Sequence, residues 1–214
     1  MSSVGLYLSG SGSLDGSDPF LSTFAYEALQ RIDFDPIPTA RDIEQGEVIN
    51  HRFAHRESHP RNSLDESARL VRGKIDDLRD VETETLAGAV LVGGGGVLNT
   101  WTDFHERGTD CRITERLKFH LQELKRQGKP VLCLGNAAFA VAVAFREQEK
   151  SLSLNPGKNP ALRKAMNQYG SKTIDSNPSW DPNHKIGCLT DLLGSSHLPA
   201  IRRKIHDFLQ EHLT

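Results

Sequence analysis

A glycine turn and three cysteines are the features of this chain that bear most directly on nucleophilic chemistry. The run KPVLCLGNAAFAVAVA, residues 129–144, contains a short apolar stretch, then Gly135-Asn136, then an apolar stretch rich in alanine. A buried strand, a sharp turn and a buried helix form a nucleophile elbow, in which the reactive side chain stands on the turn. Here the turn residue is glycine. The pattern therefore predicts the scaffold for a nucleophile without the nucleophile.

Two cysteines are the alternatives for a missing nucleophile. Cys133 lies two residues before the turn, so it shares a strand face with position 135 and is expected beneath a helical layer, where thiols are inert. Cys111 lies near His105 in a polar segment, but closeness in sequence is weak evidence for a Cys–His pair. We interpret Cys133 as a core residue and keep both thiols as fallback nucleophiles.

Glycine-bearing loops follow three predicted strands, at residues 9–17, 93–96 and 135–136. In parallel sheets ligands bind beyond the carboxyl ends of the strands, and glycine lets backbone N–H groups approach a ligand or an oxyanion. We therefore expect a pocket for a small anionic or carbonyl ligand, in which the Asn136 N–H faces those of the 93–96 loop. The residues expected to bind are Gly10, Ser11, Gly94, Gly95, Gly135 and Asn136.

Two cofactor patterns are present only in weak form. Gly10, Gly12 and Gly16 resemble a dinucleotide fingerprint, but the spacing is one residue too long. Histidines recur every four residues at 51, 55 and 59, a spacing that would suit a metal on a helix. Pro60 and the charged residues between the histidines favour a loop instead. We predict neither a cofactor nor a metal.

Apolar periodicity and capping residues predict alternating strands and helices. Strands are expected at residues 4–8, 34–38, 89–92, 130–134, 173–174 and 185–189. Asp18 and Asn159 are expected to cap helices that begin at Pro19 and Pro160, and Ser63 with Glu66 is read as a capping box. Further helices are expected after Thr114, over 137–145 and around 201–209, and Phe20, Phe24, Ala28 and Ile32 are read as the apolar face of the first helix.

Composition limits the class of protein. A chain of 214 residues with 37% hydrophobic residues is read as one α/β domain over residues 1–214. Strands that alternate with helices imply a mostly parallel sheet covered on both faces. A formal net charge of −2 without clustered Lys and Arg argues against nucleic-acid binding, and no apolar run reaches a membrane span. No signal peptide is visible, and unpaired cysteines favour a cytoplasmic location.

Six blocks of the sequence resemble the ThiJ/PfpI superfamily, and within it the ElbB-like branch, which is associated with isoprenoid biosynthesis and glyoxalase activity. The blocks are LSGSGSLDGS at 8–17, VINH at 48–51, RNSLDESARLVRGKI at 61–75, DFHERGTDC at 103–111, GKPVLCLGNAA at 128–138 and HKI at 184–186. The resemblance implies a flavodoxin-like three-layer sandwich, related to the class I glutamine amidotransferases. It also implies a homodimer.

The departures from the ElbB-like pattern concern its reactive groups. The family cysteine at the elbow aligns with Gly135, and the family glutamate early in the first helix aligns with Leu21. Glyoxalase-type chemistry needs a nucleophile with a depressed pKa and a neighbouring group that handles the proton. We therefore expect a degenerate, non-catalytic member of the branch. The alternative is an active glyoxalase or amidase that uses Cys133 or Cys111.

Overall fold

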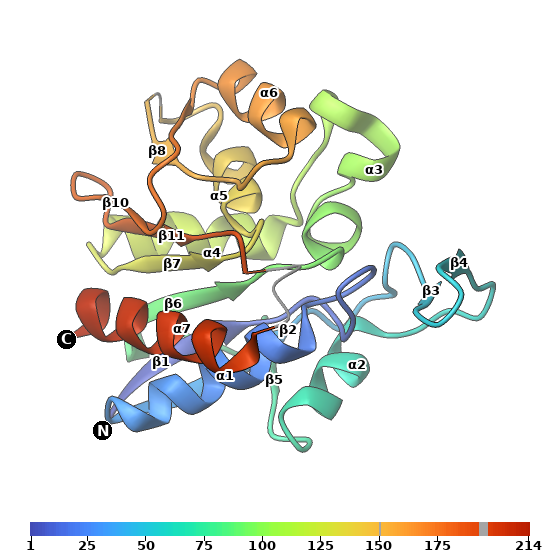
Figure 1. The fold of residues 1–214 in the computed structure, drawn as a ribbon, viewed down its shortest axis with the longest axis horizontal. Helices are drawn as coiled ribbons and strands as arrows, with labels where there is room; N and C mark the ends of the chain where they lie inside the picture. The colour runs from blue at the N-terminus through green and yellow to red at the C-terminus, as the bar shows by residue number, and fades with distance from the viewer. Residues whose placement is uncertain (150, 193–196) are drawn as a thin grey trace.

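A seven-stranded sheet forms the centre of the molecule (Figure 1). The computed structural model describes residues 1–149, 151–192 and 197–214. The strand order is β10-β11-β7-β6-β1-β2-β5; β10 is antiparallel to β11, and the other neighbours are parallel. The strands are β1 (Ser2–Tyr7), β2 (Phe34–Ala40), β5 (Asp76–Asp77), β6 (Leu86–Val92), β7 (Val131–Leu134), β10 (Ser179–Asp181) and β11 (Ile186–Leu189). The predicted mostly parallel α/β sheet is confirmed.

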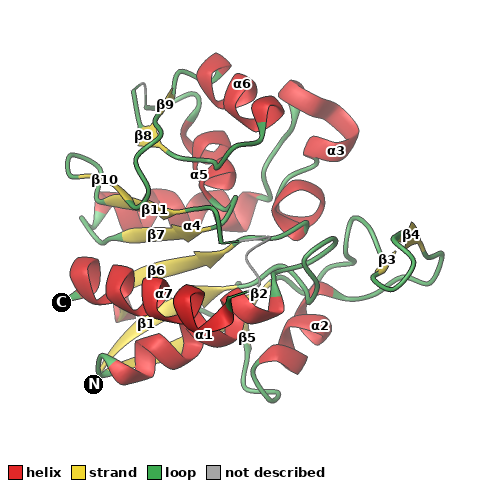
Figure 2. Cartoon of the chain, viewed as in Figure 1, coloured by secondary structure: helices red, strands yellow, loops and turns green. Residues whose placement is uncertain are grey.

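Helices cover both faces of this sheet (Figure 2). One face carries α1 (Pro19–Arg31) and α7 (Leu198–Leu213), with α2 (Ser63–Leu70) beside them. The opposite face carries α4 (Glu115–Arg126), α5 (Ala138–Phe145) and α6 (Pro160–Gln168). Within the described ranges, no helix combines the length and the apolar character that crossing a bilayer requires.

Strand residues alternate between two separate apolar cores. In β7, Leu132 and Leu134 pack with α1 and α7, whereas Val131 and Cys133 pack with α4 and α5. The same alternation places Val90 and Val92 of β6 on the first face and Ala89 and Leu91 on the second. Successive strand residues point to opposite faces, so these apolar runs are buried on both sides.

Short strand pairs and helical turns lie outside the central sheet. Two short pairs lie outside it: β3 (Ile49–Asn50) with β4 (His55–Arg56), and β8 (Ser153–Leu154) with β9 (Lys172–Thr173). The strand expected at 173–174 therefore belongs to a separate pair and not to the central sheet. The remaining turns are α3 (Phe104–Arg107), a π-helical turn (Val97–Trp101) and 3₁₀ turns (Thr83–Thr85 and Gly108–Asp110).

Helix caps confirm some sequence predictions and correct others. Asp18 and Asn159 cap α1 and α6 as expected. The capping box at Ser63 is wrong: Asn62 is the cap of α2, and its Oδ1 accepts hydrogen bonds from the N–H groups of Leu64 and Asp65. Glu66 instead forms ion pairs with neighbouring arginines.

The buried face of α1 differs in part from the predicted one. Ala28 is buried, and Phe24 and Ile32 pack partly buried against the apolar core, as predicted, whereas Phe20 is exposed. Leu21, Ala25 and Leu29 are also buried on this face and were not predicted.

Candidate active-site elbow

The elbow between β7 and α5 has the predicted backbone. Gly135 follows the last residue of β7 and adopts φ +65°, a left-handed conformation that favours glycine. Its N–H donates to the Leu189 carbonyl of the neighbouring strand end, at 2.8 Å. The sharp strand-to-helix turn is therefore present, and position 135 contributes no side chain to it.

Asn136 closes the turn by binding the glycine loop after β6. Its Oδ1 accepts a hydrogen bond from the Gly94 N–H at 2.8 Å, and its Nδ2 donates to the Gly94 carbonyl at 3.1 Å. This pair, which we call the Asn136–Gly94 lock, uses both polar groups of the Asn136 side chain.

Three N–H groups of the glycine loop that were expected to face a ligand are paired within the chain. Besides Gly94, the N–H of Gly95 donates to the Ser13 carbonyl at 2.9 Å, and that of Gly96 donates to the Gly16 carbonyl at 3.0 Å. The Gly10 N–H likewise donates to Ser67 Oγ at 2.9 Å. The Gly95 and Gly96 hydrogen bonds hold the 93–96 loop against the 9–17 loop, and none of these four N–H groups is available to a ligand. Ser11 takes part in the same packing through a bridge to Ser17.

A pocket of about 230 Å³ opens beside Gly135 and Asn136. Its far wall is the start of α6 with the preceding turn, including Lys158 and Leu162, and its third side is the chain after β11. Lys158 Nζ lies 3.7 Å from Asp191 Oδ2 at the rim. Of the six predicted binding residues, the structure therefore places Gly135 and Asn136 on a pocket.

Thr190 is the buried polar residue of this pocket. Its N–H and carbonyl are both paired with the Asn177 side chain, at 2.9 and 2.8 Å. Its Oγ1 is buried and has no hydrogen-bond partner among the described residues. A buried hydroxyl without a partner costs free energy, so this group calls for an explanation.

Position 21, where the ElbB-like pattern would place a glutamate, lies in the apolar core. Leu21 is 1% exposed and belongs to the cluster on the α1/α7 face, together with Leu134 and Leu189. Asp18 is the carboxylate one helical turn earlier. It accepts a hydrogen bond from the Leu21 N–H at 3.0 Å, so its side chain serves as the helix cap.

The fallback thiols are both buried. Cys133 lies opposite Cys188 in the register of β7 and β11, and the hydrogen bond with Cys188 together with burial raises the pKa of the Cys133 thiol. Burial also raises the pKa of Cys111, whose Sγ lies 3.4 Å from the Tyr169 hydroxyl. The expected partner His105 instead has Nδ1 at 3.2 Å from Glu47 Oε2. Thiols held neutral are poor nucleophiles.

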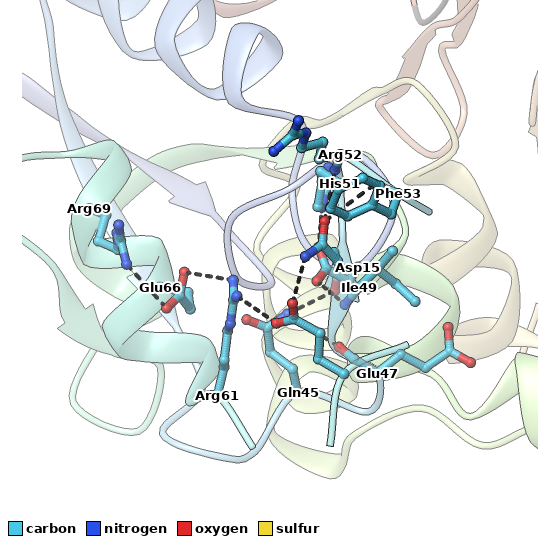
Figure 3. Close-up of polar contacts among 12 residues, drawn as sticks. Asp15, Gln45, Glu47, Ile49, His51, Arg52, Phe53, Arg61, Glu66 and Arg69 are labelled. Atoms are coloured by element: carbon cyan, nitrogen blue, oxygen red, sulfur yellow. Dashed lines mark hydrogen bonds and ion pairs between the residues drawn. The ribbon is translucent and has the colours of Figure 1, made fainter. Parts of the chain in front are cut away.

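The second polar constellation centres on Asp15 and His51 (Figure 3). The Asp15 side chain is 1% exposed; its Oδ1 accepts a hydrogen bond from His51 Nε2 at 2.7 Å, and its Oδ2 accepts one from the Ile49 N–H at 2.8 Å. Gln45 Nε2 donates to the Asp15 carbonyl at 3.1 Å. Since a carboxylate only accepts, the proton of this contact lies on His51 Nε2.

Ion pairs extend this constellation to α2. Asn50 Nδ2 donates to Glu57 at 2.8 Å, and Glu57 pairs with Arg61 at 3.2 Å. Arg61 in turn approaches Glu66 of α2 at 3.9 Å (Figure 3). Three of the family-like blocks, at 8–17, 48–51 and 61–75, therefore meet here and tether the excursion of residues 41–62 to the body of the molecule.

The evenly spaced histidines do not share a helix. His51 follows β3, His55 belongs to β4 with its ring 6.0 Å from that of Phe53, and His59 lies in the following loop. In the described parts of the chain, no three His, Cys, Asp or Glu side chains are grouped as metal ligands.

Part of the chain is similar in sequence to amidotransferase-like proteins. No family model matches it. It is 34% identical over 132 residues to the human "Glutamine amidotransferase-like class 1 domain-containing protein 3, mitochondrial", an alignment that covers 61% of this chain and 49% of that protein. The chain thus spans about half the length of the curated relatives it matches.

Solved structures share the fold over the whole chain. An isoprenoid biosynthesis protein with an amidotransferase-like domain from Ehrlichia chaffeensis gives a TM-score of 0.90 at 20% identity, covering 100% of this chain and 98% of that one. A ThiJ/PfpI domain protein from Brachyspira murdochii gives 0.57 at 13% identity, covering 98% and 96%. These likenesses confirm the predicted flavodoxin-like sandwich.

Sequence reasoning missed the residues that complete the elbow pocket. Thr190 and Asp191 directly follow the predicted strand at 185–189, and Lys158 lies in an Asn-Pro-Gly-Lys-Asn-Pro turn before the predicted helix at 160. The signal was therefore available, because residues after parallel strands and at helix starts gather at one edge of the sheet. The order of the last strands, which brings β11 next to β7, was not evident from the pattern.

Proposed function

We propose that this chain is a catalytically degenerate, ligand-binding member of the ElbB-like branch of the ThiJ/PfpI superfamily. Its elbow has the backbone conformation of a nucleophile elbow but carries no nucleophile. The pocket beside the elbow binds a small ligand without covalent chemistry. The homodimer and the cytoplasmic location stay predictions; the curated relatives carry "mitochondrial" in their names.

Gly135 is the observation that carries this proposal. An elbow residue at φ +65° exposes its side chain at the turn, and glycine has none to expose. The proton-handling partner expected at position 21 is a core leucine. Neither half of the two-residue chemistry is therefore supplied by the positions that the family pattern uses.

The second candidate function is a glyoxalase- or amidase-type activity that uses Cys133 or Cys111. Burial of both thiols and their raised pKa values argue against it, because only the thiolate attacks a carbonyl carbon. This candidate would require the chain to open before reaction.

A glyoxalase assay with methylglyoxal tests the proposal. We expect the wild type to show no turnover above that of buffer, and Cys133→Ala and Cys111→Ala to behave like the wild type. Gly135→Cys with Leu21→Glu restores the two family groups, and adding Asn136→Ala frees the Gly94 N–H. Turnover in the double or triple variant would show that only reactive groups were lost.

Matched variants keep this test interpretable. Gly135→Ala introduces the same left-handed strain as cysteine, of order 1–2 kcal/mol, without a thiol. Circular dichroism identifies variants in which the buried glutamate at position 21 unfolds the chain. Turnover by the wild type that Cys133→Ala or Cys111→Ala abolishes would refute the proposal and establish the second candidate.

A further inference from the structure

The elbow pocket contains two features that point to one class of ligand. The first is the Thr190 hydroxyl, which is buried with no partner among the described residues, although both backbone groups of Thr190 are satisfied. The hydroxyl oxygen is inaccessible in the structure, so a polar ligand in the pocket would supply the missing hydrogen bond after rotation of the Thr190 side chain. An apolar ligand would leave the hydroxyl without a partner.

The second feature is the Lys158–Asp191 pair at the rim. The atoms are 3.7 Å apart, and the side chains are 89% and 44% exposed. An exposed ion pair of this length contributes little stability and exchanges its partners readily. The structure thus already shows a carboxylate in contact with Lys158, the one cation among the described residues that line the pocket.

The wall formed by α6 adds positive potential. Asn159 and Leu162 line the pocket at the first turn of this nine-residue helix, and the positive end of the helix dipole lies there. The first N–H groups are capped, since Asn159 Oδ1 accepts from Ala161 and Leu162. The helix therefore contributes its field and not a direct hydrogen bond.

We propose that the elbow pocket takes a small monocarboxylate, whose carboxylate displaces Asp191 from Lys158 and accepts a hydrogen bond from Thr190 Oγ1. This inference rests on the proposed function for the location of the site. Leu162 and Pro156 line the space left for a short apolar group. A volume of about 230 Å³ corresponds to roughly eight waters at about 30 Å³ each, which suits a ligand of a few carbon atoms.

Titration with propionate, followed by ¹H–¹⁵N correlation spectra, tests the inference. We expect shifts at Gly135, Asn136 and Thr190 in the wild type. Lys158→Gln is expected to weaken propionate about tenfold or more, because a charge-assisted hydrogen bond is lost. Asp191→Asn is expected to strengthen it up to about fivefold, because the competing carboxylate is removed. The two rim variants therefore have effects of opposite sign.

Thr190 supplies a readout that a merely structural residue would not give. Thr190→Val removes the unpartnered hydroxyl at nearly constant volume, so it should weaken propionate while leaving the thermal midpoint unchanged or raised. Thr190→Ser keeps the hydroxyl and should retain binding. Lys164→Gln on the exposed side of α6 and Asp65→Asn on α2 change the charge by the same amounts away from the pocket, and both should bind like the wild type.

The other outcomes overturn the inference. The inference is wrong if millimolar propionate causes no shifts, or if Lys158→Gln binds propionate as tightly as the wild type does. It is also wrong if propionamide binds as tightly as propionate, or if inorganic phosphate binds more tightly than propionate. Methylglyoxal turnover is measured separately. If the protein shows no turnover and propionate causes no shifts, the carboxylate ligand is refuted, but the proposal of a degenerate elbow is not. Turnover by the wild type rejects the degenerate elbow itself.

Discussion

The elbow and the Asp15–His51 constellation lie at the same edge of the sheet and differ in what they contain. The elbow has the backbone of a reactive site and a pocket of about 230 Å³, but no nucleophilic side chain at its turn. The constellation has a buried carboxylate and a histidine 2.7 Å apart, and these groups bind the chain itself. An aligned pair of ionisable groups is therefore insufficient to identify a reactive site, because such pairs also fix long loops.

The two regions are connected by hydrogen bonds of the glycine loops. Gly94 is held by Asn136 on the elbow side, and Gly95 and Gly96 are held by the 9–17 loop that carries Asp15. A change in one region can therefore reach the other through a few residues. The following predictions test whether the two regions differ in the way described, beginning with the largest effect.

The reactivity of the thiols has the largest expected effect and tests whether the elbow lacks a nucleophile. All three cysteines are free and buried, so modification by a thiol reagent requires the chain to open. An opening free energy of about 4 kcal/mol slows labelling about a thousandfold relative to the denatured chain. We expect this slowing for the wild type, measured by absorbance with an aromatic disulfide. Gly135→Cys should add one fast thiol; fast labelling of a native thiol in the wild type would contradict the comparison.

Removal of the Asp15 carboxylate tests whether the constellation is structural. Asp15→Ala leaves the Ile49 N–H and His51 without their acceptor, and we expect a loss of about 3–4 kcal/mol in the free energy of unfolding. Asp15→Asn retains an acceptor and should lose about 1 kcal/mol. Urea denaturation measures both values, and limited proteolysis within residues 41–62 should accelerate in the alanine variant. Equal stabilities of Asp15→Ala and the wild type would contradict the tethering role.

Acid sensitivity of folding is expected from a buried histidine that lies outside both regions. Burial lowers the pKa of His120 to about 4, and its Nδ1 contacts the Tyr7 hydroxyl at 3.0 Å. Because the unfolded histidine titrates near 6.5, the unfolded state binds more protons between pH 6.5 and 4, and stability falls as the pH is lowered through this range. The expected loss is about 3 kcal/mol.

A histidine variant assigns this loss to a residue. In His120→Gln the stability should vary less between pH 6.5 and 4 than in the wild type. Urea denaturation at several pH values gives both profiles. An unchanged pH dependence in His120→Gln would exclude His120 as the acid-sensitive group.

The smallest predicted effect concerns the Asn136–Gly94 lock. Asn136→Ala removes both hydrogen bonds, and because water can reach the pocket beside them, we expect a loss of about 1–2 kcal/mol. Asn136→Asp keeps the acceptor for the Gly94 N–H but places a carboxylate oxygen against the Gly94 carbonyl, so it should be no more stable than the alanine variant. Hydrogen exchange at the Gly94 amide should accelerate in the alanine variant. An unchanged exchange rate would mean that the lock does not form in solution.

The sequence predicts five of the seven strands of the sheet, most helix starts and the elbow, because these depend on local patterns, but it misses the short edge strands β5 and β10. Asp18 and Asn159 cap helices, and Gly135 takes a positive φ, for reasons contained in a few adjacent residues. The pocket was only half predicted, since Lys158 and Thr190 meet Gly135 through the pairing of β11 with β7. The N–H groups of the glycine loop were expected to face a ligand for a similar reason: the groups that accept their hydrogen bonds lie far away in the sequence.

The Asn136–Gly94 lock has a consequence for the history of such a site. If position 135 once carried a nucleophile, regaining activity requires a thiol there, a carboxylate at position 21 and release of the Gly94 N–H. Each change alone brings no activity, and a carboxylate among the apolar neighbours of Leu21 would lower stability. Under selection for a folded protein, such a loss behaves as an evolutionary ratchet, in which the first steps of reversal are disfavoured.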